Sequence, residues 1–317
     1  MDVGGAALEN SEPGTVNGLG SAECESALEA AIAQHLQKDT PSLVPMAKSL
    51  ALAASHDVTV LLTGETGTGK TFLARMIHHF SVRRDQGFLV IPCGALAANL
   101  IESEFFGHDR GAFTGADRAK LGKFQAAGEG TLLLDEIDTL GLEQQANLLR
   151  VLETGEFEAV GSNRTLKCRA RIIAASNWDL EEAVASGKFR QDLYYRLHVM
   201  CFHLPPLRDR PEDIGHLARG MAARFAARFR KDLVTISPEV LTILQTFSWP
   251  GNIRQLENVM QQAVLVSNGP ELLRRHLPVS NGAGSAPYGI GGTIGSLMQN
   301  CEARERSVIE RAVTSHA

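Results

Sequence analysis

The segment Val58–Thr71, VTVLLTGETGTGKT, decides the fold. Its apolar start, Val58–Leu62, has the composition of a buried parallel strand, and a helical pattern over Lys70–Phe80 follows the glycine-rich loop. The loop Gly64–Thr71 fits the P-loop pattern in the strand–loop–helix context that this pattern needs. Its glycines let consecutive backbone N–H groups turn toward an anion, and the helix N-terminus adds partial positive charge. A nucleotide triphosphate site is therefore expected here.

The whole loop contributes to this expected site. Lys70 is predicted to reach the β- and γ-phosphates of ATP, and the Thr71 hydroxyl to ligate Mg²⁺. The predicted ATP-binding residues are Gly64, Glu65, Thr66, Gly67, Thr68, Gly69, Lys70 and Thr71.

Four more short apolar runs alternate with helical patterns along the first two thirds of the chain. Strands that alternate with helices indicate a parallel sheet with helices on both of its faces. The expected strands are Val58–Leu62, Phe88–Ile91, Thr131–Leu134, Arg171–Ala175 and Met200–Leu204, and the expected helices are Lys70–Phe80, Leu142–Leu152 and Leu180–Ser186.

The pattern changes after Pro205-Pro206. Three helices, Asp213–Phe229, Pro238–Thr246 and Ile253–Val266, are predicted with no strand between them, so a small helical domain should follow the sheet. The predicted parts of the chain are a flank with a short helix over residues 1–42, a nucleotide-binding part over 43–208, a helical part over 209–278, and a linker with a C-terminal helix over 279–317.

Composition and charge exclude some classes of protein. The formal net charge of -5 argues against a chain that is basic along its whole length, although a small local DNA-binding element stays compatible with it. No apolar run approaches the roughly 20 residues of a membrane helix. The five cysteines are isolated and lack metal-ligand spacing, which is typical of reduced thiols in the cytoplasm.

Two carboxylates follow the apolar run Thr131–Leu134. Downstream of a P-loop and on a separate strand, such a pair indicates nucleotide hydrolysis. Asp135 is expected to hold Mg²⁺, directly or through water, and Glu136 to polarise the attacking water as a general base. Asn177, after the next strand, is predicted to orient that water or to sense the γ-phosphate. A helix-capping role for Asn177 is the alternative.

The loop Gly111–Ala116, GAFTGA, is the most specific feature of the chain. It places one aromatic ring, Phe113, and one hydroxyl, Thr114, among small residues. This composition carries too little apolar area for a core and suits a mobile loop that presents Phe113 to a partner.

Together with Phe106–Asp109 before it, this loop resembles the sigma-54 contact loop of bacterial enhancer-binding proteins, which are AAA+ transcription activators of the nitrogen-regulator type. The resemblance runs from about Leu43 to Pro278, and several independent motifs occur in the family's order. They are Gly64–Thr71, Leu132–Glu136, Phe189-Arg190, Arg196, Leu204–Arg210 and Trp249–Leu256. The resemblance implies a P-loop AAA+ fold, with a five-stranded parallel sheet sandwiched by helices and followed by a small all-α lid.

The resemblance also implies roles for single residues. Family members form rings, usually hexamers, with ATP held between subunits. Arg190 and Arg196 match the arginine fingers that reach the neighbour's γ-phosphate, although surface ion pairing is the alternative for both. Arg254 matches the sensor arginine of the lid. The residues that match the sigma-54 contact are Gly111, Ala112, Phe113, Thr114, Gly115 and Ala116.

The function implied by the resemblance is that of an ATP-hydrolysing transcription activator, which remodels the sigma-54 RNA polymerase holoenzyme to allow open-complex formation. The alternative is a regulatory interaction protein that forms mixed rings with a full-length activator or sequesters sigma-54 from it. A general AAA+ chaperone or helicase loader is a third hypothesis, which is disfavoured because those families lack the loop Gly111–Ala116.

Two of the departures from the family pattern concern control of the catalytic glutamate and DNA binding. Family members commonly carry an asparagine at the end of the second strand, where it restrains the catalytic glutamate, whereas this chain has Pro92. Proline offers neither an amide side chain nor a backbone N–H. The segment Cys301–Val313 resembles only the first helix of a helix-turn-helix, and two helices are needed for docking in a major groove. We therefore expect an incomplete DNA-binding element and no sensing domain in the N-terminal flank.

Overall fold

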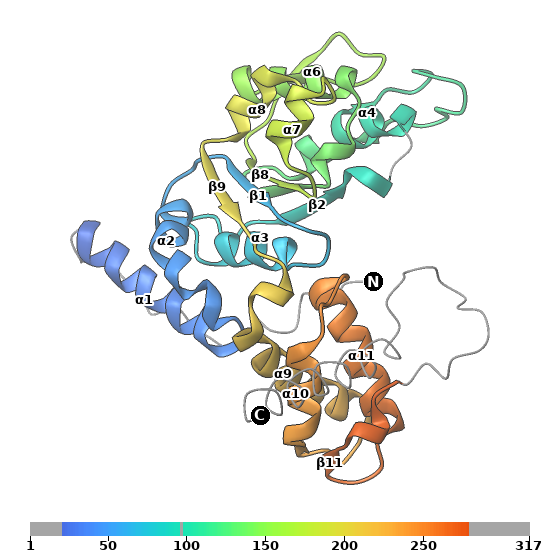
Figure 1. Ribbon diagram of the computed structural model, residues 1–317. Helices are drawn as coiled ribbons and strands as arrows, with labels where there is room; N and C mark the ends of the chain where they lie inside the picture. The colour runs from blue at the N-terminus through green and yellow to red at the C-terminus, as the bar shows by residue number, and fades with distance from the viewer. Residues whose placement is uncertain (1–20, 96–97, 279–317) are drawn as a thin grey trace. The chain divides into compact units, whose positions relative to one another are not determined.

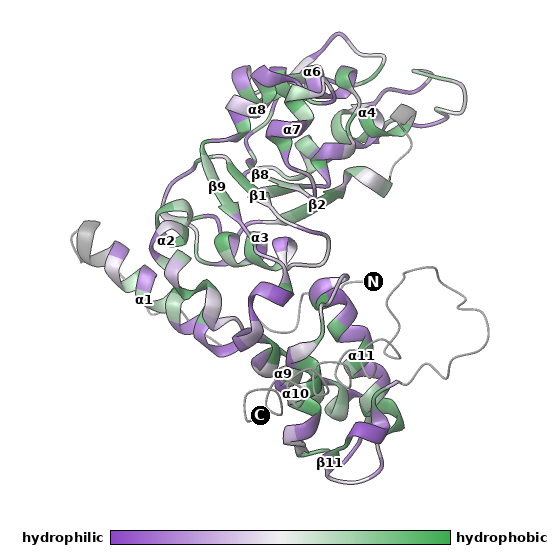
Figure 2. Cartoon of the chain, in the orientation of Figure 1, coloured by the Kyte–Doolittle hydropathy of each residue, from purple (hydrophilic) through white to green (hydrophobic). Residues whose placement is uncertain are grey.

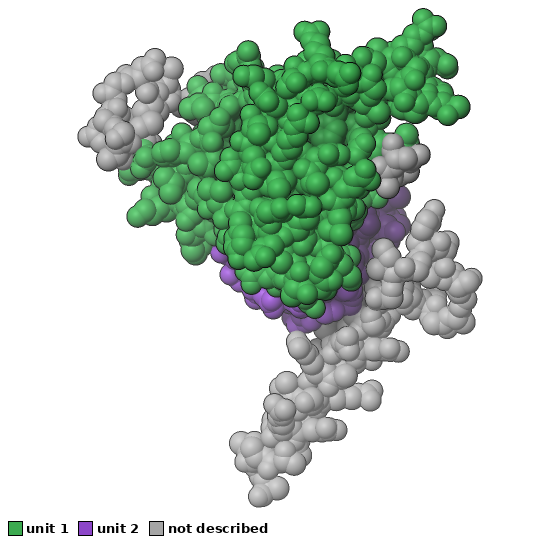
Figure 3. Space-filling model, turned by 90° about the horizontal axis from the view of Figure 1, so that it is seen from above, with its two compact units in different colours: residues 1–34, 45–65, 69–204 green, residues 35–44, 66–68, 205–317 purple. Residues whose placement is uncertain are grey.

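The structure is a computed structural model that describes residues 21–95 and 98–278. The described residues divide into two compact units (Figures 1 and 3). Unit 1 comprises residues up to 34, 45–65 and 69–204, and unit 2 comprises residues 35–44, 66–68 and those from 205 onward. The tip of the glycine-rich loop, residues 66–68, therefore belongs to unit 2.

The centre of unit 1 is a five-stranded parallel sheet in the order β2-β5-β8-β1-β9. All five strands fall on the apolar runs predicted from the sequence, and the predicted α/β fold class is confirmed. Figure 2 shows β2 and β9 largely in hydrophobic colours. The strands are β1 (Val60–Thr63), β2 (Phe88–Pro92), β5 (Thr131–Asp135), β8 (Arg171–Ser176) and β9 (Met200–His203).

Helices cover both faces of this sheet (Figure 1). Side chains alternate between the faces of a strand, so Leu61 and Leu132 join the apolar cluster beneath α4, α6, α7 and α8, while α3 lies against β1, β5 and β8 on the opposite face. The helices are α2 (Ala47–Ser55), α3 (Lys70–His79), α4 (Ala98–Phe106), α5 (Lys123–Ala126), α6 (Leu142–Thr154), α7 (Leu180–Ala185) and α8 (Gln191–Leu197). The sequence patterns predicted α3, α6 and α7 but missed α2, α4, α5 and α8.

Short elements complete unit 1. Two antiparallel pairs of strands lie outside the main sheet, and short 3₁₀ turns follow β2 and β5. They are β3 (Gly107–His108) with β4 (Lys120–Leu121), β6 (Glu156–Glu158) with β7 (Thr165–Lys167), η2 (Cys93–Ala95) and η3 (Ile137–Thr139).

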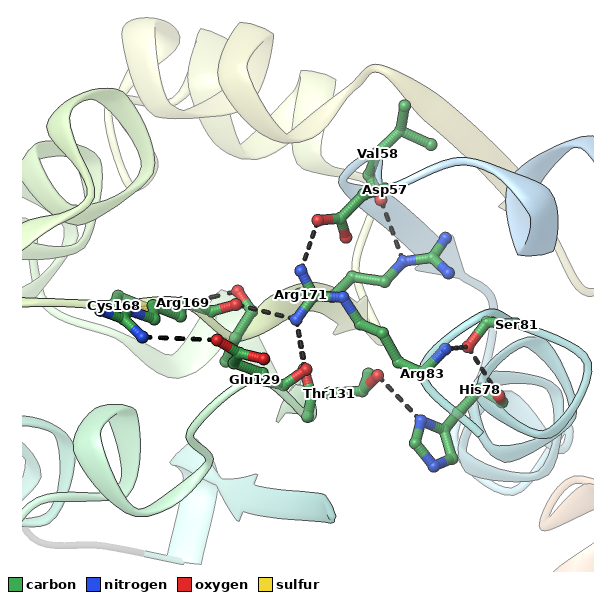
Figure 4. A network of polar contacts seen from close by, with 12 residues as sticks. Asp57, Val58, His78, Ser81, Arg83, Glu129, Thr131, Cys168, Arg169 and Arg171 are labelled. Carbon is green, nitrogen blue, oxygen red and sulfur yellow. Dashed lines mark hydrogen bonds and ion pairs between the residues drawn. The ribbon is translucent and has the colours of Figure 1, made fainter. Parts of the chain in front are cut away.

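Two arginines fix the edge of the sheet where its strands begin (Figure 4). Arg171, which is buried at the start of β8, donates to the Val58 carbonyl at 3.3 Å and to the Ala53 carbonyl near the end of α2. Burial lowers the pKa of Arg171 to about 10, so the guanidinium stays charged at neutral pH. Arg83 pairs with Asp57 and donates to the Arg169 carbonyl at 2.8 Å. This network ties together the segments at the beginnings of β1 and β8.

Unit 2 is mainly helical and has its own apolar core. Trp249 is fully buried there, and its indole N–H donates to the Leu244 carbonyl at 2.8 Å. The elements from residue 205 onward are η4 (Leu207–Asp209), α9 (Pro211–Phe229), β10 (Thr235–Ile236), α10 (Pro238–Thr246), α11 (Asn252–Val266), β11 (Glu271–Leu272) and η5 (Arg274–His276). The three helices predicted for this part of the chain are present.

The prediction of no strand between these helices is wrong. The two-residue strand β10 lies between α9 and α10 and pairs in parallel with β11. Two residues carry too short a pattern to be recognised in a sequence, and the pairing joins segments that are far apart in the chain.

The N-terminal part of the described chain contains α1 (Ser21–Asp39) and η1 (Pro41–Met46). The helix predicted over Glu23–Gln37 is thus present and slightly longer. The predicted linker and the predicted helix at Ser296–Val313 lie outside the described residues. No helix within residues 21–95 and 98–278 has the length and apolarity needed to cross a membrane.

Candidate functional site

The glycine-rich loop begins directly after β1 with backbone angles that favour glycine. Gly64 has a φ of 139° and Gly69 a φ of 108°. A side chain at Gly64 would also run into the carbonyl oxygen of Leu204, which follows the neighbouring strand β9. Glycine at these two positions therefore lets the loop curl tightly over the end of the sheet and begin α3 at Lys70.

Lys70 ties this loop to the end of a neighbouring strand. Its side chain is buried, and the ammonium group donates to the carbonyl oxygens of Gly64 at 2.7 Å and Glu65 at 3.0 Å. It also donates to Asn177 Oδ1 at 2.7 Å. A buried ammonium group needs such partners, because an unpaired charge in the interior is strongly unfavourable.

The next residue, Thr71, lies beside the acidic end of β5. The Thr71 hydroxyl donates to Asp135 Oδ2 at 3.3 Å, and Asp135 Oδ1 accepts from the Glu136 backbone N–H at 3.1 Å. A hydroxyl and a carboxylate side by side form an oxygen donor set of the kind that Mg²⁺ prefers.

Asn177 lies between Lys70 and Glu136. Its amide nitrogen is 3.4 Å from Glu136 Oε1, which is a long hydrogen bond, while its amide oxygen faces Lys70. The backbone N–H of Asn177 donates to Asp138 Oδ1 at 2.9 Å, so Asp138 holds the backbone from which the Asn177 side chain projects. The residues predicted from three strand ends are thus brought together: Lys70 and Thr71 after β1, Asp135 and Glu136 at β5, and Asn177 after β8.

The alternative of a helix cap for Asn177 is wrong. The residue that caps α7 is Asp179, whose carboxylate accepts from the backbone N–H groups of Glu181 and Glu182. Asn177 instead directs its side chain toward the two charged groups described above.

The two predicted arginine fingers lie around α8 and have different surroundings. Arg190 precedes α8, is partly exposed, and forms a 2.7 Å ion pair with Asp192. Arg196 is exposed on α8, and its guanidinium donates twice to the Leu152 carbonyl near the end of α6, at 3.0 and 2.8 Å. Within one chain, then, Arg190 makes a surface ion pair and Arg196 caps the end of a helix.

Two residues that support the site escaped the sequence analysis. Asp138 is one, and its position three residues after Asp135 was the available signal. The other is Gln145, fully buried on α6, which donates to the Leu140 and Lys188 carbonyls at 2.8 and 3.0 Å and accepts from the Arg190 backbone N–H at 2.8 Å. Gln145 thus fixes the backbone that carries Arg190, and no local pattern marks it.

Within unit 2, the tip of the P-loop is held through its carbonyl groups. Asn252 donates to the Thr66 carbonyl, the Ile253 backbone N–H to the Gly67 carbonyl, and Arg210 to the Thr68 carbonyl, each at 3.0 Å. Arg254 is exposed, and a Cβ added at Gly67 would lie 3.2 Å from Arg254 Cβ.

Arg210 and Asp213 form a buried pair in the same unit, with 3.7 Å between Arg210 Nη1 and Asp213 Oδ2. Burial lowers the pKa of Arg210 and raises that of Asp213. Asp213 also accepts from the Ser42 backbone N–H at 2.9 Å and from the Ser42 hydroxyl at 2.5 Å. These contacts tie the start of α9 to the segment before α2.

The loop Gly111–Ala116 projects between β3 and β4. The Gly111 N–H donates to the Ala116 carbonyl at 2.9 Å, which closes the base of the loop, and Phe113 is 41% exposed at its tip. The Phe113 ring rests edge-on against the His108 ring, with 4.9 Å between their centroids.

His108 is itself held by two contacts. Its Nε2 lies 3.1 Å from the Arg118 carbonyl oxygen and its Nδ1 lies 2.7 Å from the Ser103 hydroxyl. Because a carbonyl only accepts, the neutral ring carries its proton on Nε2, and the Ser103 hydroxyl donates to Nδ1. The aromatic side chain of the loop thus lies on a fixed platform.

Parallel strands that end in a P-loop, an acidic pair and an asparagine define a P-loop protein of the AAA+ class. Comparison with known families agrees: residues 36–203 match the sigma-54 interaction domain, and residues 208–287 match the AAA+ ATPase lid domain. This chain belongs to the sigma-54-dependent transcriptional activator family.

Individual relatives support this assignment. The chain is 46% identical over 244 residues to the regulatory protein AtoC of Escherichia coli, which covers 77% of this chain and 53% of AtoC. It is 44% identical over 254 residues to the transcriptional regulatory protein ZraR of Klebsiella oxytoca, covering 79% of this chain and 57% of ZraR. The chain thus spans about half the length of these curated relatives.

Solved structures give the same fold. The crystal structure of NtrX from Brucella abortus in complex with ATP superposes with a TM-score of 0.68 at 30% identity, over 80% of this chain and 60% of NtrX. The ADP complex of NtrX superposes with a TM-score of 0.71 at 29% identity, over 90% of this chain and 65% of NtrX.

The surroundings of Gln145 make a prediction about stability. Replacing Gln145 by leucine removes the partner of the Leu140 carbonyl, the Lys188 carbonyl and the Arg190 N–H, so we expect the free energy of unfolding to fall by about 1–3 kcal/mol. Urea denaturation followed by circular dichroism measures it. The matched control is Glu143→Gln, an exposed change on the same helix, which should stay within about 0.5 kcal/mol of the wild type. Equal stability of the two variants would show that Gln145 does not hold this segment.

Proposed function

We propose that this protein binds ATP with Mg²⁺, hydrolyses it in a ring of identical subunits, and uses the cycle to remodel the sigma-54 RNA polymerase holoenzyme. The observation that carries the proposal is the meeting of Lys70, Thr71, Asp135, Glu136 and Asn177 at the ends of three adjacent strands of unit 1. In this proposal, residues 43–208 are the nucleotide-binding part and residues 209–278 are the lid. An activator of RNA polymerase acts in the cytoplasm.

The proposed ATP site uses the loop Gly64–Thr71. The glycine conformations at Gly64 and Gly69 turn backbone N–H groups inward, which suits a chain of phosphates. Lys70 would exchange its carbonyl partners for the β- and γ-phosphates, and the similarity to an ATP-bound NtrX structure supports this assignment.

The oxygen donors around Thr71 and Asp135 fit Mg²⁺. The two side chains lie 3.3 Å apart, and both offer oxygen atoms, which are the ligands this ion requires. When bound, Mg²⁺ would neutralise negative charge on the phosphates. The protein's own part is to hold the Thr71 hydroxyl and the Asp135 carboxylate facing the same point.

Glu136 is the proposed general base and Asn177 the group that orients the attacking water. Both follow parallel strands at the same edge of the sheet, so they can face one γ-phosphate. Arg190 and Arg196 are proposed to act in trans, where an arginine finger contributes a factor of roughly 10³–10⁵ in rate. Arg190 would have to exchange Asp192 for the neighbour's nucleotide, which its exposed position allows. Arg254 is the proposed sensor of nucleotide state in unit 2.

The proposed load is sigma-54, contacted by the loop Gly111–Ala116 with Phe113 and Thr114 at its tip. The loop is closed at its base and exposes Phe113, so the aromatic side chain can enter a partner's surface. Aromatic side chains that become buried in this way often carry a large share of binding energy.

The ATPase assignment predicts the behaviour of Lys70→Ala. Without the ammonium group the phosphate charge loses its main protein partner, so steady-state ATP hydrolysis should fall by about 100-fold or more. The matched control is Lys48→Ala, an exposed lysine of α2, which should retain the wild-type rate. Hydrolysis is followed by phosphate release, and a Lys70→Ala protein that hydrolyses ATP at the wild-type rate would remove Lys70 from the site.

The partner assignment predicts the behaviour of Phe113→Ala. Binding to sigma-54 in the presence of ADP and a phosphate transition-state analogue should weaken by at least about tenfold, because a buried aromatic anchor is lost. The control is Leu121→Ala, another exposed apolar side chain, at the base of the same hairpin. Sigma-54 binding by Phe113→Ala that matches the Leu121→Ala control would show that the contact lies elsewhere.

A further inference from the structure

Gly94 lies where a side chain would meet the proposed catalytic base. A methyl group built on Gly94 would overlap Glu136 Oε2, and it would lie 3.3 Å from Glu136 Cδ and 3.4 Å from Thr139 Cγ2. The φ of Gly94 lies outside the positive range, so the backbone conformation at this position does not itself require glycine. What glycine provides at this position is therefore space for one carboxylate.

The carboxylate that fills this space is held from its other side. Glu136 Oε1 accepts from the Asn177 amide at 3.4 Å, and the Asn177 amide oxygen accepts from Lys70 Nζ at 2.7 Å. In the part of the chain that the structure describes, Asn177 is the side-chain donor that reaches Glu136. Pro92, the residue opposite Asp135 at the end of β2, has no donor to offer.

The Glu136 backbone adds a second constraint. It has the left-handed angles φ 58° and ψ 46°, which are uncommon for a residue with a side chain. Such conformations persist where the surroundings over-determine them. The Thr139 hydroxyl and backbone N–H both bind the Glu136 carbonyl, at 2.7 and 3.0 Å, so this turn is fixed and only the Glu136 side chain is left to move.

We infer that Gly94 is a positioning residue: it leaves space for the Glu136 carboxylate at a resting position within reach of Asn177. In this position the side-chain amide of Asn177 links the proposed base, Glu136, to Lys70. This inference rests on the proposed ATPase function and adds a way in which the same site is regulated. Lys70 must leave Asn177 in order to hold the β- and γ-phosphates, and Asn177 must leave Glu136 in order to face a γ-phosphate. A nucleotide with a γ-phosphate therefore breaks the contact between Asn177 and Glu136, whereas ADP, whose β-phosphate engages Lys70 alone, leaves that contact in place.

The consequence is a difference between two nucleotide affinities. A ligand shifts a conformational equilibrium only through its differential affinity for the two states. In the wild type, an ATP analogue binds more weakly than it otherwise would, because part of its interaction is used to displace Glu136. A side chain at position 94 would fill this space, so Glu136 could not take up its resting position even before the nucleotide binds.

The test compares Gly94→Ala with Gly87→Ala, which adds a methyl group before β2 with no atom within 4 Å of it. Binding of ADP and of a non-hydrolysable ATP analogue is measured by calorimetry on the full chain. We expect Gly94→Ala to bind the analogue about three- to tenfold more tightly than the wild type, the range set by the net contribution of one ordinary hydrogen bond, since the Asn177–Glu136 contact is long. ADP affinity should change by less than about twofold, and Gly87→Ala should match the wild type for both.

The outcomes separate this inference from the proposed function. Equal ATP-analogue to ADP affinity ratios in the wild type and Gly94→Ala would overturn the role of Gly94 while leaving the nucleotide site intact. Wild-type protein that binds neither nucleotide would overturn both. Gly94→Ala protein that fails to fold, judged by its thermal unfolding, would contradict the inference, because the added methyl group overlaps only the Glu136 carboxylate, which can move.

Discussion

The buried ammonium group of Lys70 is the interaction on which the site depends. A charge in this position is stable only with close partners, and the chain supplies them from two directions: the carbonyls of its own loop, and the Asn177 side chain after β8. The loop is thereby fixed to the strand next to β1. Because Asn177 also reaches Glu136, one cation connects the glycine-rich loop, Asn177 and, through Asn177, Glu136. The Lys70 ammonium group is also the group that the phosphates of a bound nucleotide would contact, so binding of the proposed ligand would change these contacts.

The parallel sheet makes this arrangement geometrically simple. β5, β8 and β1 are neighbours: Thr131 of β5 pairs with Arg171 of β8, and Val60 of β1 pairs with Ile173 two residues further along β8. Arg171 and Arg83 tie together the segments where the strands begin, and the candidate site lies at the opposite ends. The loop Gly111–Ala116 is different in kind, because two-residue strands support it and its aromatic tip rests on His108 alone among the described ring contacts of Phe113. In the proposed function, a site at the ends of the main sheet is combined with a loop that projects from a separate short hairpin.

Much of this could be predicted from the sequence, for physical reasons. Five buried strands carry continuous apolar runs, and the P-loop and acidic pair occupy fixed positions at their ends. The helix α8 was missed because its two tyrosines and its charged residues show no clear helical spacing that would separate them from the preceding loop. Asp138 and Gln145 were missed because their importance comes from backbone groups 39 and 45 residues away in sequence, at Asn177 and Arg190. The space at Gly94 was likewise invisible, because it exists only where η2 approaches Glu136.

The central claim is that nucleotide hydrolysis at this site drives the remodelling of sigma-54 holoenzyme. The most direct measurement is open-complex formation on a sigma-54 promoter with purified holoenzyme and this chain, detected by the reactivity of unpaired promoter bases. The account predicts open complexes with ATP and none with ADP or with a non-hydrolysable analogue. Promoter opening that is equal with ATP and with the analogue, or absent while the chain hydrolyses ATP and binds sigma-54, would contradict it.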